Sequence, residues 1–413
     1  MKQKKLSNGL HLLLFEDKKK HSTLVNFVTD FGGIDSGYII DGKKHTIRNG
    51  MAHFLEHLLI ESSPYGNLMR VFGEMQMNTN GSTYPNRTEY YFNAVERLEE
   101  ALPILIKAID NASFTKEDVE KVKGAIYEEI RRGEDDRGKR LFTLRNECLF
   151  KNIPYYNTIG TLEDVESFTF EEVKACYETF YTLSNQYLVI AGNFDEDAII
   201  EQVEEICKSL PNRNNKVEKV HIKEPIKVNK KRGTTLMPIG NPFFQLCYKI
   251  DVSRYTPEER LELDYYMHYF CRMNFGSVST CNQELQREKI IIGGVSFSTF
   301  VIEDFFLVAI GAHIVENKEK IFEKKIQSIL ENPIYDQSLF DLYQNENKID
   351  IALREERIGA TVFPFLENLF TFLYPYPDTI EQLLSYSFSK FEKKMKELPF
   401  TEYSVCCIKN NTE

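Results

Sequence analysis

The sequence predicts an α+β fold built as two similar domains in tandem, each with an antiparallel-rich sheet and helices packed on it. The first observation is size, because 413 residues exceed one ordinary core and suit two domains of about 200 residues each. The second is composition, since 42% apolar residues provide enough material for two cores. The third is that strand-like and helix-like runs follow a similar order in both halves, which suggests internal duplication.

In the first half, the periodicity of apolar residues predicts a mixture of short strands and amphipathic helices. Asn49-Gly50 precedes a mostly apolar helix, and Pro85-Asn86 occupies the turn between two paired strands. The expected strands are 10–15, 23–30, 75–84, 88–95 and 186–191. The expected helices are 51–60, 67–74, 98–110, 116–132, 139–150, 171–182 and 196–209.

A polar stretch from Pro211 to Gly233, rich in Asn and Lys, is the best candidate for a linker. It predicts an N-terminal domain at 1–212, a linker at 213–233 and a C-terminal domain at 234–413. The expected strands of the second half are 243–250, 295–300, 304–312 and 403–408. Its expected helices are 257–273, another after the loop 276–279, 317–331, 337–355 and 380–396.

Charge and targeting signals argue against several classes of protein. The net charge is −11 and basic residues occur in short runs such as Lys18 to Lys20, so nucleic-acid binding is not expected. No apolar signal-peptide core follows Met1 to Gly9, and no run approaches the ~18 apolar residues of a membrane span. The 8 cysteines form no Cys-x-x-Cys pair, which is typical of reduced thiols. We therefore expect a cytoplasmic protein without a membrane span.

A metal-binding pattern lies at His53-Phe54-Leu55-Glu56-His57. On a helix, side chains four residues apart lie on one face, so both imidazoles can bind one ion. Glu56 lies on nearly the same face and can reach water at the metal without being a ligand. This His-x-x-Glu-His order inverts the commoner zinc-peptidase motif. In such sites zinc polarises a peptide carbonyl and lowers the pKa of water, while the carboxylate transfers the proton.

The alternative reading is a chance pair of surface histidines on an amphipathic helix. The neighbouring residues argue against it, because Ala52, Phe54, Leu55, Leu58 and Leu59 make this a mostly buried helix. Two histidines and a glutamate on a buried helix need a polar partner, and a metal ion is a suitable one.

A catalytic zinc ion takes three protein ligands and keeps one open position, so the histidine pair lacks one ligand. The candidate carboxylates are Glu128 and Glu129 on the expected helix 116–132. Taken alone, two adjacent glutamates on a helix usually form a solvated face. The residue pattern leaves open which of the two points inward.

The segment from Gly50 to Leu58 resembles the signature of the pitrilysin, insulysin and mitochondrial-processing-peptidase family. The resemblance implies that both histidines are zinc ligands and that Glu56 is the general base. It also implies a third ligand in the segment 124–130, on Glu129, with Glu128 as the fallback.

The resemblance extends along the whole chain, strongly in the first half and weakly in the second. Residues 6–10 are similar to the family's opening strand. Residues 80–90 are similar to its substrate-side edge strand, so Asn80 is expected to contact a peptide that adds as a β-strand. In the second half, Arg287 matches an Arg that holds the substrate, and the loop 276–279 fits the family's glycine-rich loop or an ordinary helix-starting turn.

Two positions depart from the family pattern. The family often has a further supporting Glu where this chain has Val122, and the sequence leaves open whether Glu120 or Glu128 replaces it. The Tyr that accompanies the Arg in active members is Gly294 here. Family members of this length act as pairs that enclose the peptide in a four-domain chamber. The resemblance therefore implies a zinc-bearing chain with a homologous second subunit that supplies the Arg and Tyr.

The resulting expectation is a zinc endopeptidase that acts on peptides or unfolded segments, as one chain of a heterodimer. One alternative is a single-chain enzyme that uses Tyr265 or Tyr269 in place of the missing Tyr. A second alternative is a non-catalytic binding or structural subunit of the same fold. A third is dedicated processing of one precursor rather than general peptide turnover.

Overall fold

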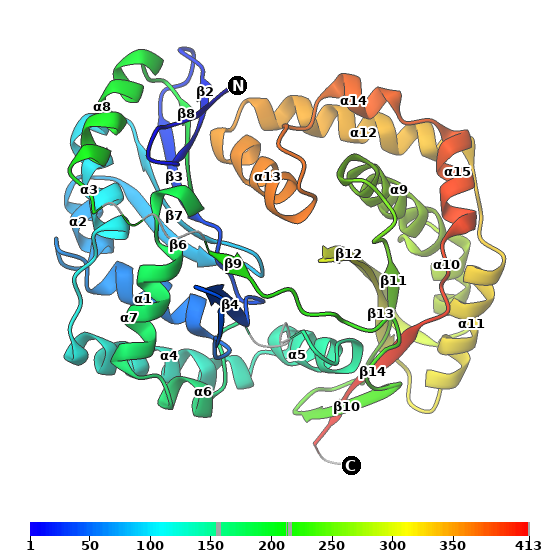
Figure 1. Cartoon of the computed structure of the whole chain (residues 1–413). Helices are drawn as coiled ribbons and strands as arrows, with labels where there is room; N and C mark the ends of the chain where they lie inside the picture. The colour runs from blue at the N-terminus through cyan, green and yellow to red at the C-terminus, as the bar shows by residue number, and fades with distance from the viewer. Residues whose placement is uncertain (154–157, 212, 214–216, 412–413) are drawn as a thin grey trace. The chain divides into compact units, whose positions relative to one another are not determined.

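The structure is a computed structural model of the whole chain, and it describes residues 1–153, 158–211, 213 and 217–411. These residues form two compact units. The first unit comprises Met1–Arg132 and Asn157–Ile222, and the second comprises Gly133–Tyr156 and Lys223–Glu413. Each unit combines a sheet with helices packed on it (Figure 1), which confirms the expected α+β class.

The main sheet of the first unit contains β1 (Lys2–Lys5), β2 (His11–Glu16), β3 (Thr23–Thr29), β6 (Asn78–Thr83), β7 (Thr88–Ala94) and β8 (Gln186–Gly192). Their order across the sheet is β1-β2-β8-β3-β7-β6. β2 and β8 run parallel, and the other neighbours run antiparallel. The two strands expected around Pro85-Asn86 are β6 and β7, and their pairing is confirmed. β6 ends the sheet, so within the described residues its outer edge carries no further strand.

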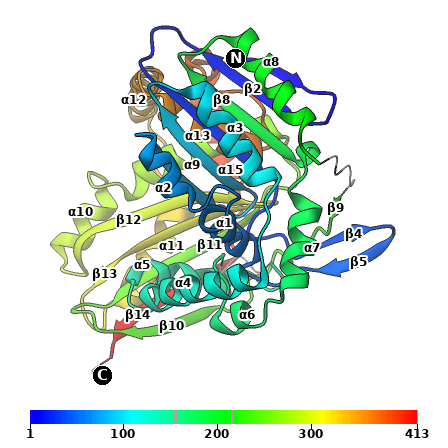
Figure 2. The ribbon, with the colours of Figure 1, turned by 90° about the vertical axis from the view of Figure 1, so that its left-hand side faces the viewer.

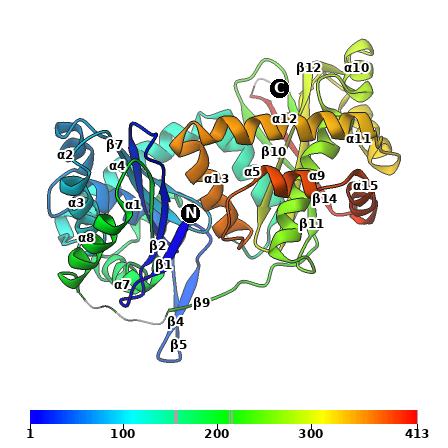
Figure 3. The ribbon, with the colours of Figure 1, turned by 90° about the horizontal axis from the view of Figure 1, so that it is seen from above.

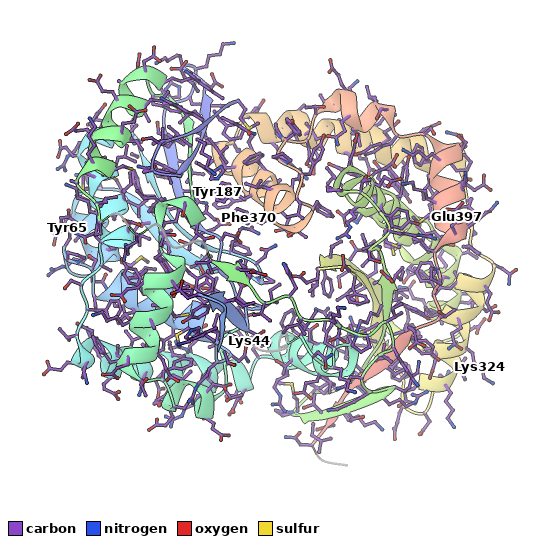
Figure 4. The ribbon with its side chains drawn as sticks, in the orientation of Figure 1. Lys44, Tyr65, Tyr187, Lys324, Phe370 and Glu397 are labelled. Carbon is purple, nitrogen blue, oxygen red and sulfur yellow. The ribbon has the colours of Figure 1, made fainter. Side chains whose placement is uncertain are left out.

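The helices of the first unit are α1 (Met51–Glu61), α2 (Leu68–Glu74), α3 (Leu98–Asp110), α4 (Lys116–Glu134), α6 (Leu162–Glu166), α7 (Phe170–Phe180) and α8 (Glu196–Lys208). α3 lies against β3 and β7, as Figure 2 shows. The core forms between one face of the sheet and these helices, and one cluster of buried side chains includes Phe27 and Phe92 from strands and Phe54 and Leu58 from α1. Tyr65, in the loop between α1 and α2, lies at the outer side of the unit (Figure 4).

The sheet of the second unit contains β10 (Arg232–Met237), β11 (Phe243–Asp251), β12 (Ile291–Ile302), β13 (Phe305–Ile314) and β14 (Tyr403–Asn410). Their order is β10-β14-β11-β13-β12. The last strand, β14, lies between β10, which is parallel to it, and β11, which is antiparallel. β8 has the same position between β2 and β3 in the first unit. The shared topology confirms the expected similarity of the two halves.

The helices of the second unit are α5 (Arg137–Leu149), α9 (Pro257–Phe275), α10 (Thr280–Arg287), α11 (Glu319–Glu331), α12 (Gln337–Glu355), α13 (Ile358–Thr371), α14 (Ile380–Ser385) and α15 (Phe388–Glu397). α12 is a long helix with α13 beside it (Figure 3), and α14 also contacts it (Figure 1). Lys324 and Glu397 point outward from α11 and α15 (Figure 4). α5 packs on β10 and β14, where the hydroxyl of Ser404 donates to the carbonyl of Cys148 at 3.3 Å.

A small sheet of β4 (Gly37–Ile40), β5 (Lys43–Thr46) and β9 (Glu218–Lys219) completes the first unit. β4 and β5 form a hairpin, seen extending from the unit in Figure 2, with Lys44 marked on it in Figure 4. Asp41 and Gly42 form its turn with φ values of 51° and 72°. Lys219 on β9 donates to the carboxylates of Asp30 and Asp35 at 2.7 and 3.1 Å. These contacts fix one described part of the expected linker to the first unit.

The expected domain boundaries stay a prediction, and the compact units differ from them in detail. Residues 133–156 join the second unit because α5 packs on its sheet. Residues 217–222 join the first unit through β9. Residues 214–216 of the expected linker lie outside the described residues.

The structure corrects one helix expectation of the second half and adds one helix that was not expected. The single helix expected at 380–396 is two helices, α14 and α15, because the chain is extended at Tyr386 and Ser387. The side chain of Ser387 accepts from the backbone N–H of Lys390 and starts α15 as its N-cap. The helix α13 was not expected, and it contains Pro364 in its interior.

Two further properties concern membrane-spanning helices and the state of the cysteines. None of the helices in the described part of the chain is long and apolar enough to cross a bilayer. All eight cysteines are buried free thiols, in agreement with their scattered spacing.

Candidate metal centre

α1 is buried on nearly every side, and this burial brings its polar residues into the interior. Phe54, Leu55, Leu58 and Leu59 are each 0% exposed, and burying a side chain of this size contributes roughly 1.5–3 kcal/mol to folding. The helix begins after Gly50, whose φ of 87° favours glycine, and a Cβ there would lie 2.8 Å from the Cα of Gly160. The start of α1 is therefore fixed against the loop that carries Gly160.

His53 and His57 lie one turn apart on the same face of α1, with ring centroids 4.7 Å apart. Their Nε2 atoms lie 3.5 and 3.4 Å from the Oε2 atom of Glu129 on α4. The structure thus brings together the two histidines of the motif and one of the two glutamates that the sequence offered as a third ligand.

The burial pattern of α4 explains why Glu129 and not Glu128 faces the histidines. Val119, Val122 and Ile126 are buried at helical spacing, and Glu129 continues this face one turn further on. Glu128 is rotated by about 100° from it. Its side chain is 61% exposed and accepts from Arg131 at 2.9 Å, as a solvated ion pair.

The geometry of the three side chains fits a zinc ion. Their ligand atoms all lie within 4.8 Å of one another. Tetrahedral zinc with bonds of about 2.0–2.2 Å holds neighbouring ligand atoms about 3.4 Å apart. The two histidine-to-carboxylate separations, 3.5 and 3.4 Å, match this value. Two imidazole nitrogens and one carboxylate form a donor set typical of a catalytic zinc site with an open fourth position.

Glu56 lies beside the three side chains without belonging to the group of ligand atoms. Its side chain is buried, and burial raises the pKa of its carboxyl group, while hydrogen bonding to Thr83 lowers it in part. Oε2 of Glu56 accepts from the hydroxyl of Thr83 at 2.7 Å. A carboxylate next to a metal-binding group is suited to accept a proton and to return it.

Glu61 contacts the far side of His57, and sequence reasoning did not assign it a role. Its Oε1 atom lies 3.3 Å from Nδ1 of His57, opposite to the nitrogen that faces Glu129. Burial lowers the pKa of His57, but the hydrogen bond to Glu129 and the other nearby carboxylates raise it by more. The spacing in the sequence could have indicated this contact, because a Glu four residues after a helical His lies on the same face of the helix.

Asn80 lies on β6, which also contacts α1. Successive residues of a strand point to opposite sides, so Gly81 and Thr83 face α1 while Asn80 points the other way and is exposed. A Cβ on Gly81 would lie 2.9 Å from Oε1 of Glu56 and 2.5 Å from Cδ1 of Ile60. The glycine therefore allows α1 to approach the edge strand closely.

One position that departs from the family pattern, Val122, has a clear structural role. Val122 is 0% exposed and belongs to the apolar core of the first unit. Glu120 is 69% exposed and accepts from Lys123 at 2.8 Å. Because Glu128 is also exposed, neither glutamate takes the place of the supporting Glu in this structure.

The second unit contains the other residues expected to contact substrate. Arg287 is exposed at the last position of α10. It does not belong to the group of candidate metal ligands in the first unit. Gly294 is exposed on β12, so no hydroxyl is present at the position of the expected Tyr. Tyr269 is 0% exposed, and its hydroxyl accepts from Asn347 at 2.9 Å. Tyr265 packs on the apolar core from the same helix.

Both halves of the chain resemble known proteins. Residues 34–161 match the family described as insulinase (peptidase family M16), and residues 167–346 match the peptidase M16 inactive domain. The zinc protease YmfH of Bacillus subtilis is 31% identical over 316 residues, which is 76% of this chain and 74% of that protein. Subunit beta of the mitochondrial-processing peptidase of Caenorhabditis elegans is 26% identical over 190 residues, 45% of this chain and 41% of that protein.

Solved structures share the fold over the whole chain. An M16-like peptidase from Alicyclobacillus acidocaldarius superposes with a TM-score of 0.89 at 24% identity, over 99% of this chain and 98% of that chain. Pitrilysin superposes with a TM-score of 0.72 at 18% identity, over 99% of this chain and 45% of that chain. The identity to YmfH, its extent, and the two matched domains together establish the relationship. This chain belongs to peptidase family M16, the insulinase family.

Proposed function

We propose that the chain is a zinc-dependent endopeptidase and the zinc-bearing member of a two-chain assembly. The observation that supports this most strongly is the convergence of His53, His57 and Glu129 beside the buried Glu56. The cofactor is Zn²⁺, in keeping with relatives from Bacillus subtilis and Rickettsia felis that are named zinc proteases.

In this proposal, His53, His57 and Glu129 hold the metal, which when bound polarises a peptide carbonyl and activates water. Glu56 is the general base. Its carboxylate accepts a proton from the attacking water and returns it to the nitrogen of the leaving amine. Glu61 accepts a hydrogen bond from Nδ1 of His57, which keeps the Nε2 lone pair directed at the metal position.

The substrate in this proposal is a peptide or an unfolded segment held as an added strand. β6 ends its sheet and lies next to α1, so its outer edge can pair with an extended peptide through main-chain hydrogen bonds. Main-chain pairing tolerates varied side chains. We assign Asn80 a contact to this peptide, and we assign Arg287 a contact to the substrate carbonyl.

A homologous partner chain completes the proposed enzyme. The motive is Gly294, which offers no hydroxyl to polarise the scissile carbonyl, together with the buried, bonded hydroxyl of Tyr269. One relative is a subunit by its name, the beta subunit of the mitochondrial-processing peptidase. A partner that supplies an Arg and a Tyr would close the chamber around the peptide. Losing one such donor typically lowers the rate about a hundredfold to a thousandfold.

The isolated chain is therefore expected to cleave peptides weakly, and a co-purifying homologous partner is expected to restore full activity. The measurement compares turnover by the pure chain with turnover by the complex from the native source. Fast cleavage by a homogeneous preparation without a second polypeptide would contradict the two-chain assembly and leave the zinc assignment intact.

A second candidate function is a non-catalytic subunit of the same fold. The observation in its favour is the match of residues 167–346 to a domain described as inactive, together with the apolar, buried Val122. Such a subunit would bind peptide without zinc-dependent cleavage. The two candidates differ in the behaviour of one variant, Glu56→Gln.

The test is cleavage of an unstructured peptide mixture by the chain with its co-purified partner, before and after chelation and after zinc is added back. The endopeptidase requires loss and recovery of activity with zinc. Glu56→Gln should retain zinc and lose about a hundredfold to ten-thousandfold in rate, because it removes the proton acceptor. Equal activity of Glu56→Gln and wild type would exclude the proposed role of Glu56. Peptide binding without any cleavage would favour the non-catalytic subunit.

We also place the protein in the cytoplasm, in keeping with its eight buried free thiols. General peptide turnover and dedicated processing of one precursor differ in selectivity. Cleavage at one position in one protein of a whole-proteome digest would identify a dedicated processing enzyme.

A further inference from the structure

The general base Glu56 is held by the edge strand β6 as well as by its own helix. Glu56 is 8% exposed, and Oε2 accepts from the hydroxyl of Thr83 at 2.7 Å. This distance is typical of a strong hydrogen bond from a hydroxyl to a carboxylate. Thr83 is the last residue of β6, and it faces α1 because it is two residues from Gly81.

Gly81 restricts the same carboxylate from a second direction. A Cβ added to Gly81 would lie 2.9 Å from Oε1 and 3.0 Å from Cγ of Glu56. The carboxylate therefore lies directly over the glycine backbone. Ile60 covers the same glycine from the next turn of α1. With one oxygen bonded to Thr83 and the side chain confined against Gly81, the orientation of the carboxylate plane is determined by β6.

Two tyrosine hydroxyls near Glu56 hydrogen-bond to each other. Tyr90, the cross-strand neighbour of Gly81, shares a hydrogen bond of 2.8 Å with Tyr181. Both tyrosines are fully or almost fully buried. Thr83 is thus the residue whose hydroxyl the structure places on the Glu56 carboxylate.

We propose that Thr83 is a positioning residue for catalysis, which binds one oxygen of Glu56 and thereby fixes the carboxylate in its place over Gly81, beside the three candidate metal ligands. This inference rests on the proposed function, because it assigns Thr83 a role through Glu56. It also links the two tasks of β6, since the strand expected to pair with the peptide also orients the group that activates water. A carboxylate misplaced by about 1 Å is expected to lower the rate about a hundredfold.

The test compares two variants at one position. Thr83→Val keeps the shape of the side chain and removes the hydroxyl, whereas Thr83→Ser keeps the hydroxyl and removes the methyl group. We expect Thr83→Val to lower kcat about a hundredfold with KM changed less than twofold, and to keep its zinc. Thr83→Ser should recover most of kcat, because it restores the donor.

Thr23→Val is the matched control. Thr23 is a buried threonine of β3 in the same sheet, and its hydroxyl donates to the carbonyl of Asn193 at 2.8 Å. Thr23→Val therefore removes a comparable hydrogen bond at a position distant in the sequence from the motif at residues 53–57. Thr23→Val is expected to lower the melting temperature with kcat unchanged. A merely structural role of Thr83 would give the same result for Thr83→Val.

A crystal structure of Thr83→Val gives a readout that is independent of turnover. We expect the Glu56 carboxylate to leave its place over Gly81 or to occupy two rotamers, with both histidines unmoved. A single, unchanged Glu56 rotamer together with unchanged kcat would overturn the inference. Wild type without zinc-dependent cleavage, alone and with its partner, would instead contradict the proposed function and with it the inference. A fully active Thr83→Val in an active wild-type background contradicts the inference alone.

Discussion

Zinc affinity should distinguish two adjacent glutamates of α4 that differ only in orientation. Glu129 places Oε2 at 3.5 and 3.4 Å from the Nε2 atoms of His53 and His57. Glu128 is 61% exposed and pairs with Arg131 at 2.9 Å. The substitutions Glu129→Gln and Glu128→Gln are chemically identical and change the net charge equally, so each variant is the control for the other.

The expected magnitudes follow from these contacts. Removing a residue that only supports a metal ligand typically weakens metal binding 10–100-fold. Removing a charged ligand itself should exceed this, so Glu129→Gln is expected to weaken zinc binding by at least about 100-fold, or about 2.7 kcal/mol. Glu128→Gln removes an exposed ion pair worth about 0–1 kcal/mol of folding stability and no metal contact. Its zinc affinity should equal that of wild type.

The assay is competition for zinc against a chromophoric chelator with metal-free protein, followed by thermal unfolding at fixed free zinc. A 100-fold weaker zinc affinity also removes about 2.7 kcal/mol of the stability that saturating zinc provides. Weak zinc binding by Glu128→Gln with normal binding by Glu129→Gln would refute the assignment of the third ligand. Equal affinities of both variants and wild type would refute the participation of a carboxylate from α4.

Three further results are expected. Glu61→Gln should weaken zinc binding about 10–100-fold in the same competition assay, because Glu61 supports the ring of His57; an unchanged affinity would exclude that support. Gly50→Ala should lower the free energy of unfolding by about 1–3 kcal/mol in urea titrations, since φ is 87° and the added Cβ meets Gly160; equal stability would contradict the strain. Burial raises the pKa of Asp264 to about 7, and two nearby carboxylates add to this effect. The neutral form is therefore favoured in the folded state, and this contribution to stability is lost as pH rises from about 4 to 7. Asp264→Asn should unfold at a higher temperature than wild type at pH 8 and show no such gain at pH 4; a gain of the same size at both pH values would contradict the raised pKa.

Much of the fold could be predicted because its elements carry strong local patterns. α1 and α4 were expected from apolar spacing, and β6 and β7 from the turn at Pro85-Asn86. The hairpin of β4 and β5 was missed although Asp41-Gly42 is a strong turn signal. Its strands are short, and β5 is exposed at every position, so no alternation of apolar residues accompanied the turn.

Other elements depend on tertiary packing that a local pattern does not contain. α5 lies before the last helices of the first unit in the sequence, yet it packs on the sheet of the second unit. α13 contains Gly359 and Pro364, which locally disfavour a helix. The helix expected at 380–396 is interrupted where Ser387 becomes the N-cap of α15. The spacing of apolar residues alone does not reveal this interruption.

In the candidate metal centre, too, some residues could be predicted from local spacing and others depend on tertiary packing. The histidine pair and Glu56 follow from spacing on one helix, so the sequence sufficed to place them. Choosing between Glu128 and Glu129 needed either a family resemblance or the orientation of α4, which depends on the burial of Val122 and Ile126. Thr83 lies in the segment 80–90 but was given no role, because a contact between residues 27 apart, on a strand and a helix, appears only once both elements have packed.

Zinc stoichiometry tests the central claim most directly. The measurement is elemental analysis of the purified, gel-filtered wild-type chain and of His57→Ala, purified identically with zinc in the growth medium. The account predicts one zinc per wild-type chain and almost none in His57→Ala. It also predicts an unchanged circular dichroism spectrum, because an open catalytic site does not hold the fold together. One zinc per chain in correctly folded His57→Ala, or wild type that binds no zinc at micromolar concentrations, would contradict it.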